Sequence, residues 1–174
     1  MAHRYTRGSL AAHANPEYAG AVHRAVQSYI DYMDTFAIGG EAQKDKKAEK
    51  QIETDTIEVT IGALGNIQSL ANSGNRILEK AAPWKLAKQS PQHPDLPKVM
   101  FTVAELLRIV AILISPVLPK SAHRIFDQLN WKMELSGKEE RFSLADAEWG
   151  RLPDGHVVGK PVPLFPRIEI LEGV

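Results

Sequence analysis

The sequence predicts an all-α protein, an antiparallel helical bundle with an irregular C-terminal tail packed on it. Three observations support this class. Apolar residues recur every three or four positions through most of residues 16–130, the spacing of one face of an α-helix. Prolines and glycines interrupt that pattern with short connections, so neighbouring helices should run antiparallel. After Asn130 the period disappears, and glycine and proline become frequent.

Size and charge restrict the possible functions. The chain has 174 residues, enough for one domain with its own core. Its 21 basic and 21 acidic residues balance, so any contact with nucleic acid must come from a local patch of cations. The absence of cysteine excludes disulfides and thiolate metal sites and suits a reducing compartment. Glu105 and Arg108 interrupt the apolar stretch 99–118, which leaves too short a run to span a bilayer. We therefore expect a cytoplasmic protein without membrane contact.

The N-terminal half predicts a leader, a helix and a connector. Residues 1–15 carry no period and predict a disordered leader, without the apolar run of a signal peptide. Asn15 and Pro16 are typical of a first helical turn, and this helix should end at Gly39 and Gly40. Residues 41–55 are mixed in charge and nearly without apolar side chains, so nothing there drives burial. We interpret them as a charged, solvated connector whose end can be helical.

A second helix is predicted from about Thr56 to Ala81. Its apolar residues share one face at a spacing of 3.6 residues, and they are Ile57, Ile61, Leu64, Ile67, Ala71 and Leu78. Three glycines lie inside it, each costing about 1 kcal/mol relative to alanine. We expect these glycines, Gly62, Gly65 and Gly74, to permit the close approach of a neighbouring helix.

The second half of the bundle follows a proline-rich turn over residues 89–98. A third helix is predicted over residues 99–114, and its apolar composition places it at the centre. Ser115 and Pro116 break it, and Pro119 begins a fourth helix that ends near Asn130. Residues 131–174 then form an extended segment packed on the bundle. Its expected anchors are Trp131, Trp149, Leu164 and Phe165.

No set of catalytic residues appears in the sequence. It lacks a P-loop, a dinucleotide fingerprint and a nucleophile elbow. None of its six histidines has the spacing of helical metal ligands, and we expect His123 to be structural. Asp31 and Asp34 on the first helix are expected to face solvent rather than to form an acid pair. The sequence thus predicts no catalytic residue, no metal site and no cofactor in this chain.

The most informative peptide is the end of the second helix, residues 75–88. Pro83 cannot donate to the helix ladder and disfavours helical geometry at Ala82, so the helix should break and present Trp84 at its end. An exposed indole can stack on a nucleotide base, worth about 1–3 kcal/mol per base. Nearby cations that can contact phosphates are Arg76, Lys80, Lys85 and Lys88. In the alternative interpretation, Trp84 closes the helical core and the cations only solubilise the surface.

The same peptide resembles a known family. Ala81-Ala82-Pro83-Trp84-Lys85-Leu86-Ala87-Lys88, preceded by Asn75, is similar to the helix-end signature in the anticodon-binding domain of methionyl-tRNA synthetases. Residues 106–129 resemble the paired helices that follow in that family, and residues 149–157 and 163–169 resemble its closing segment. The resemblance covers about residues 56–169 and implies a bundle of the class I synthetase anticodon-binding type.

The resemblance also implies roles for individual residues. Trp84 would stack on the first anticodon base, a cytosine, and Pro83 would shape the pocket. Arg167, in the closing segment, is a weaker candidate for contact with the RNA backbone. The family domain recognises the CAU anticodon of methionine tRNA and positions it for ATP-dependent attachment of methionine. The motifs of the catalytic domain that binds ATP and methionine are missing from this sequence. We therefore expect a fragment that works with methionine tRNA and with the catalytic domain of a parent ligase.

Two departures from the family pattern keep other interpretations open. The family's first helix carries an asparagine and an arginine that read the same cytosine, and residues 1–20 do not show that motif. The charged stretch 41–55 is also longer than expected between those helices. The alternative is a non-catalytic helical protein-interaction module derived from this domain. The bundle of a sister synthetase for valine, isoleucine, leucine or cysteine is a third option, against which the proline-tryptophan and closing signatures speak.

Overall fold

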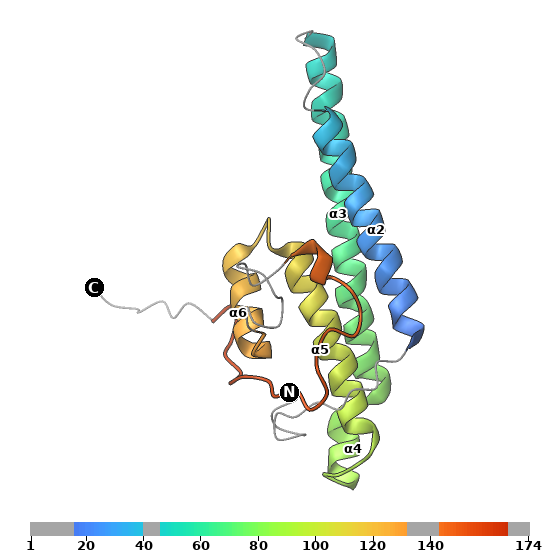
Figure 1. The fold of residues 1–174 in the computed structure, drawn as a ribbon, viewed down its shortest axis with the longest axis vertical. Helices are drawn as coiled ribbons and strands as arrows, with labels where there is room; N and C mark the ends of the chain where they lie inside the picture. The colour runs from blue at the N-terminus through green and yellow to red at the C-terminus, as the bar shows by residue number, and fades with distance from the viewer. Residues whose placement is uncertain (1–15, 40–45, 132–142, 167–174) are drawn as a thin grey trace, which may run out of the picture.

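The chain folds into a helical bundle in a computed structural model that describes residues 16–39, 46–131 and 143–166 (Figure 1). Its side chains are described over residues 18–31, 61–131 and 143–166. The elements, in chain order, are α2 (Pro16–Gly39), α3 (Lys46–Ala81), α4 (Pro83–Gln89), α5 (Asp95–Ile114), α6 (Pro119–Leu129) and the short 3-10 helix η1 (Leu144–Asp146). The predicted all-α class is confirmed.

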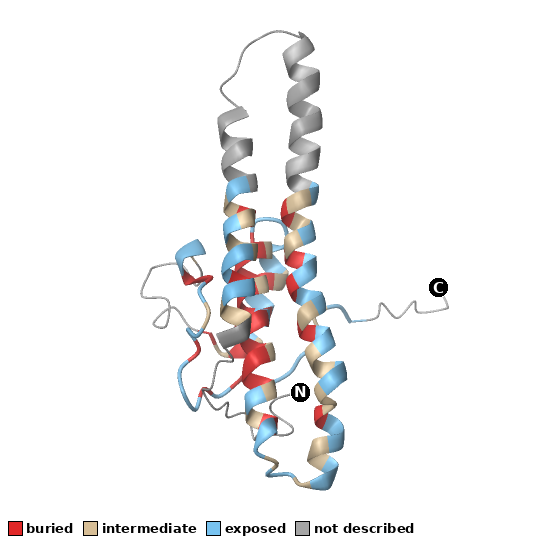
Figure 2. Cartoon of the chain, turned by 90° about the vertical axis from the view of Figure 1, so that its right-hand side faces the viewer, coloured by how far each residue is buried: buried red, intermediate tan, exposed pale blue. Residues whose placement is uncertain are grey.

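Helices α2 and α3 form a long antiparallel hairpin, and α5 and α6 pack beside its lower half (Figure 1). At 1.5 Å per residue, the 36 residues of α3 extend over about 54 Å. The amide of Asn66 donates to the Ser28 hydroxyl across the hairpin, with 3.0 Å between the two atoms. Figure 2 shows that the buried residues gather where α5 lies against the hairpin.

Helix α5 is the central element, as its composition predicts. It contacts α3, α6, α4 and η1, and Leu96, Ile109 and Ala111 are each 0% exposed. The helix begins at Asp95, earlier than the predicted start at residue 99. Among the described residues, no helix combines the length and apolar character needed to cross a membrane.

The start of α3 differs from the prediction. The helix begins at Lys46 rather than near Thr56, so it includes much of the stretch interpreted as a connector. Lysine, glutamate, glutamine and alanine are strong helix formers, and a helix already nucleated by packing extends through them at little cost. The leader over residues 1–15 and the remaining connector residues 41–45 lie outside the described residues.

The expected close approach of a neighbouring helix is wrong at Gly65 and Gly74 of α3. A Cβ added at Gly65 would meet no atom within 4 Å, because this residue is on the exposed face. At Gly74 an added Cβ would lie 3.9 Å from Leu106 Cδ1, an ordinary contact that does not require glycine.

The tail packs on the bundle through most of its predicted anchors. Trp131 is 1% exposed, and Trp149 and Leu164 pack against the core. The prediction that Phe165 anchors the tail is wrong, since this residue is 74% exposed. Leu164 is the last tail residue whose hydrogen bond is described, accepting from Arg124 Nη1 at 2.9 Å, so Phe165 lies beyond the anchored part.

Polar contacts fix the tail to the C-terminal turn of α6. The Gly159 amide donates to the Gln128 carbonyl at 2.8 Å, and the imidazole Nε2 of buried His156 lies 2.6 Å from the Leu129 carbonyl oxygen. A Cβ at residue 159 would lie 2.5 Å from the Asp127 carbonyl oxygen. Glycine is therefore required for this close approach.

The predicted positions of Asp31, Asp34 and His123 compare differently with the structure. Asp31 is exposed and accepts a hydrogen bond from Gln27 Nε2 at 2.9 Å, so its solvent-facing position is confirmed. The side chain of Asp34 lies outside the described residues. His123 is exposed on α6 rather than enclosed in the core.

Candidate nucleic-acid interface

The junction between α3 and α4 is built around Ala82. This residue has φ 42° and ψ 58°, the left-handed conformation, which turns the chain out of α3. Its amide donates to the Leu78 carbonyl at 2.9 Å, while its own carbonyl accepts from Lys85 N at 2.7 Å. Ala82 thus closes one helix and opens the next. Pro83 then occupies the first turn of α4, where its missing N–H costs no hydrogen bond.

Two adjacent residues at this junction have opposite exposures. Pro83 is among the fully buried residues, whereas 39% of Trp84 is exposed. The proline anchors the first turn of α4 in the bundle, and the next residue presents part of its indole to solvent. Trp84 is therefore not enclosed in the core, and its role in RNA binding stays a prediction.

Helix α4 itself was not predicted, because Pro83 was interpreted only as a helix break. The sequence contains a usable signal: proline suits the first helical turn, and Lys85, Leu86, Ala87 and Lys88 are all good helix formers. What the sequence does not contain is a residue at position 82 that favours a positive φ, since alanine rarely adopts it.

The four cations predicted around Trp84 fall into two groups. Arg76 and Lys80, both exposed, line one open pocket of about 510 Å³ at the end of α3. Lys85 and Lys88 are exposed on α4 and do not line that pocket. Arg167 lies outside the described residues.

Tyr18 joins this region without having been predicted. It comes from the first turns of α2 and lines the pocket with Arg76 and Lys80. Its ring also packs against Trp149 of the tail, with ring centroids 6.0 Å apart and an interplanar angle of 38°. No signal in the sequence indicates this neighbourhood, because it depends on how α2 is aligned along α3.

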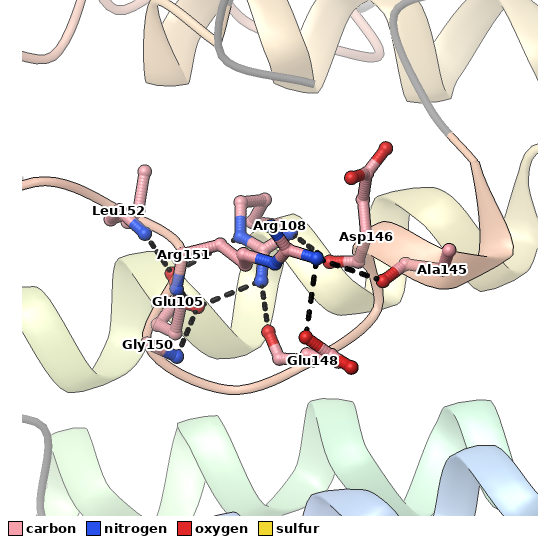
Figure 3. A network of polar contacts seen from close by, with 8 residues as sticks. All are labelled: Glu105, Arg108, Ala145, Asp146, Glu148, Gly150, Arg151 and Leu152. Atoms are coloured by element: carbon pink, nitrogen blue, oxygen red, sulfur yellow. Dashed lines mark hydrogen bonds and ion pairs between the residues drawn. The ribbon is translucent and has the colours of Figure 1, made fainter. Parts of the chain in front are cut away.

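A buried ion pair on α5 holds the loop 146–152 of the tail (Figure 3). Glu105 Oε1 lies 2.7 Å from Arg108 Nη2 and also accepts from the amides of Gly150 and Arg151, both at 2.8 Å. Arg108 donates to the carbonyls of Asp146 and Glu148. We call this arrangement of Glu105, Arg108 and the loop 146–152 the α5 clamp.

The α5 clamp connects the core to the candidate interface. The Arg108 guanidinium lies 4.9 Å from the centroid of the buried Trp131 ring, a distance typical of a cation–π contact. Because the clamp fixes residues on both sides of Trp149, it also fixes the indole against which Tyr18 packs. In the sequence, Glu105 and Arg108 appear only as interruptions of an apolar stretch.

The helical bundle is of a kind that suits an anticodon-binding domain, and the comparison with known families assigns this class. Residues 39–172 match a family described as the anticodon binding domain of methionyl tRNA ligase. The match includes most of the chain, and the chain belongs to this family.

Curated relatives are consistent with the family. Methionine–tRNA ligase of Enterococcus faecalis is 38% identical over 109 residues, which are 62% of this chain and 15% of that protein. The Nostoc sp. methionine–tRNA ligase is 34% identical over 113 residues, 64% of this chain and 21% of that protein. The Streptomyces coelicolor methionine–tRNA ligase is 28% identical over 172 residues, 97% of this chain and 29% of that protein.

The chain thus spans between 15% and 29% of the length of these relatives. The part of them that it matches corresponds to the anticodon-binding domain. All three relatives are ligases, which does not favour the alternative of a protein-interaction module.

Proposed function

We propose that this chain binds the anticodon loop of methionine tRNA and recognises its CAU anticodon through Trp84. The observation that carries the proposal is the exposed indole beside a buried proline, at the α3–α4 junction of an anticodon-binding domain. A base lying on the indole would be the first anticodon base, as the family resemblance implies.

The geometry suits stacking because part of the indole is exposed directly after a backbone position that is restricted and buried. Pro83 is buried and has a fixed φ, so the backbone immediately before Trp84 loses little freedom when a base stacks. Stacking itself tolerates any base, since every base has a π-face. Discrimination for cytosine therefore requires the shape of the pocket beside Pro83 and polar groups at its edge.

Local charge supplies the remaining affinity. The chain is neutral as a whole, but Arg76, Lys80, Lys85 and Lys88 are all exposed within or next to the α3–α4 junction. Phosphate contacts of this kind fix the position of the RNA strand, while the stacked base carries the sequence information. Arg167 remains a candidate for a further backbone contact.

The wider role follows from the relatives. The domain would hold the anticodon of methionine tRNA while a catalytic domain, using ATP and methionine, attaches the amino acid in the cytoplasm. No cofactor is proposed for this chain itself, and the catalytic domain of the parent ligase is its proposed protein partner.

The test is binding of the full chain to two anticodon stem-loop RNAs, one with CAU and one with the first base changed, followed by fluorescence anisotropy. We expect the intact chain to prefer CAU. Trp84→Ala should weaken CAU binding by about 5- to 150-fold, which corresponds to about 1–3 kcal/mol of stacking.

Two matched variants make the result specific. Trp84→Phe keeps an aromatic face and should retain part of the preference. Phe165→Ala removes an aromatic residue that lies outside the junction and is 74% exposed. This variant should bind both RNAs with the affinity of the intact chain. Equal binding of both RNAs by the intact chain contradicts the proposal and favours the protein-interaction module.

A further inference from the structure

A second candidate binding site lies next to Trp84, between the beginning of α2 and the end of α3. It is an open pocket of about 510 Å³ lined by Tyr18, Ser73, Arg76, Ile77, Lys80 and Ala81. Ala81 is separated from Trp84 by two residues, so their Cα atoms are at most about 11 Å apart. One RNA strand can therefore reach both places.

The charge of this pocket suits an anion. Arg76 and Lys80 are exposed, and among the described residues neither side chain forms an ion pair. Within the described lining residues there is no carboxylate. Two cations one helical turn apart are well placed for a single phosphate group, and arginine can bind it with two parallel hydrogen bonds.

The Tyr18 ring forms the aromatic wall of the pocket, and a contact with the tail supports its position. Tyr18 packs against Trp149 at 6.0 Å between ring centroids. The amides of Gly150 and Arg151, which follow Trp149 directly, donate to the buried Glu105 carboxylate in the α5 clamp. The position of Tyr18 is therefore supported by the core and not only by the first turns of α2.

We infer that this pocket binds a phosphodiester group of the same RNA strand, adjacent to the nucleotide stacked on Trp84. Arg76 and Lys80 neutralise the phosphate, and Tyr18 forms an aromatic wall against the sugar or base that it carries. This inference rests on the proposed RNA binding and adds a second, sequence-independent subsite with Tyr18 as a new contact residue.

The test measures the salt dependence of binding to the same two stem-loop RNAs. For single strands, the slope of log K against log salt changes by about 0.7 for each phosphate neutralised. The double variant Arg76→Gln with Lys80→Gln should reduce the slope by about 0.7 and weaken both RNAs by the same factor. Lys120→Gln, an exposed lysine at the start of α6 outside the pocket, is the matched control and should leave the slope unchanged.

Tyr18 is tested separately because it carries no charge. Tyr18→Phe keeps the ring and should bind both RNAs like the intact chain. Tyr18→Leu removes the ring and should weaken both RNAs equally without changing the slope. A thermal melt of each variant shows whether the Tyr18–Trp149 contact is also needed for folding. If the folded Tyr18→Leu variant binds both RNAs as tightly as the intact chain, the inferred contact of Tyr18 with the RNA is wrong.

The outcomes separate this inference from the proposed function. If Trp84→Ala removes the CAU preference while the double variant keeps the slope of the intact chain, the phosphate subsite is overturned and anticodon recognition through Trp84 stands. If the slope falls as expected while Trp84→Ala has no effect, the subsite is supported and base stacking on Trp84 fails.

Discussion

Arg108 and Glu105 form an ion pair at the centre of the bundle, with Nη2 and Oε1 2.7 Å apart and both side chains at 0% exposure. The pair is tolerable there because backbone groups of the tail satisfy its remaining hydrogen-bonding capacity. Glu105 accepts from three tail amides, and Arg108 donates to two tail carbonyls. A polar contact inside α5 therefore holds the loop 146–152 against the bundle, while contacts with α6 hold the rest of the described tail.

Removing one partner of this pair should be strongly destabilising. Glu105→Ala leaves the Arg108 charge buried without its partner, and we expect the free energy of unfolding to fall by about 3–5 kcal/mol in urea titrations. The exposed pair between Arg151 and Glu148, 3.2 Å apart, is the control. Glu148→Ala should cost less than about 1 kcal/mol. Equal effects of the two variants would show that the buried pair is not specially coupled to the tail.

The left-handed residue at the α3–α4 junction predicts a stabilising substitution. Alanine at φ 42° is strained, whereas glycine adopts this conformation freely. Ala82→Gly should therefore raise the free energy of unfolding by roughly 1 kcal/mol, after the greater flexibility of glycine in the unfolded chain is included. Ala71→Gly, at an exposed position inside α3, should instead lower it by about 0.5–1 kcal/mol. A loss of stability in both variants would argue against strain at residue 82.

Replacing glycine by alanine should lower the free energy of unfolding at residue 159 and raise it at residue 65. Gly159→Ala places a Cβ 2.5 Å from the Asp127 carbonyl oxygen, which is backbone and cannot move aside easily. We expect a loss of about 1–3 kcal/mol in thermal or urea unfolding. Gly65→Ala, on the open face of α3, should gain about 1 kcal/mol from helix propensity. A neutral result at residue 159 would mean that the tail can leave α6 without cost.

Stability should fall in alkaline solution partly through Tyr29. Burial raises the pKa of Tyr29 above its ordinary value of 10.0. Below pH 10 the phenol is protonated in both states and has no effect. As the pH rises above 10, the unfolded chain loses this proton first, so the free energy of unfolding decreases. Tyr29→Phe should show a smaller decrease between pH 9 and pH 11 by urea titration at each pH. Parallel curves for the two proteins would contradict this assignment.

The fold was predictable because it depends mainly on periodicity. The apolar spacing predicts the central α5, and Pro119 predicts the start of α6, which begins at that residue. Pro83 predicts the end of α3 at Ala81, but the short α4 that it begins was not predicted. The start of α3 was missed because charged residues without an apolar face give no burial signal, although they continue a helix well.

The candidate site was predictable only in its local part. Trp84 and Pro83 are adjacent in sequence, so one helix break determines both of their environments. Tyr18 and Trp149 are in contact because α2 is aligned along α3 and because the α5 clamp holds the tail. No sequence pattern predicts either of these two arrangements. Glu105 shows the same difficulty, since a carboxylate in an apolar run does not reveal that it binds distant amides.

The contact between Tyr18 and Trp149 has a kinetic consequence. It joins residues near the two ends of the described chain, and it is complete only when α2 and the loop held by α5 are both docked. The entropy cost of closing such a long loop increases only with the logarithm of its length, but contacts so distant in sequence slow the search for the native state. The aromatic wall beside Trp84 should therefore assemble last during refolding, after the helices that surround it are in place.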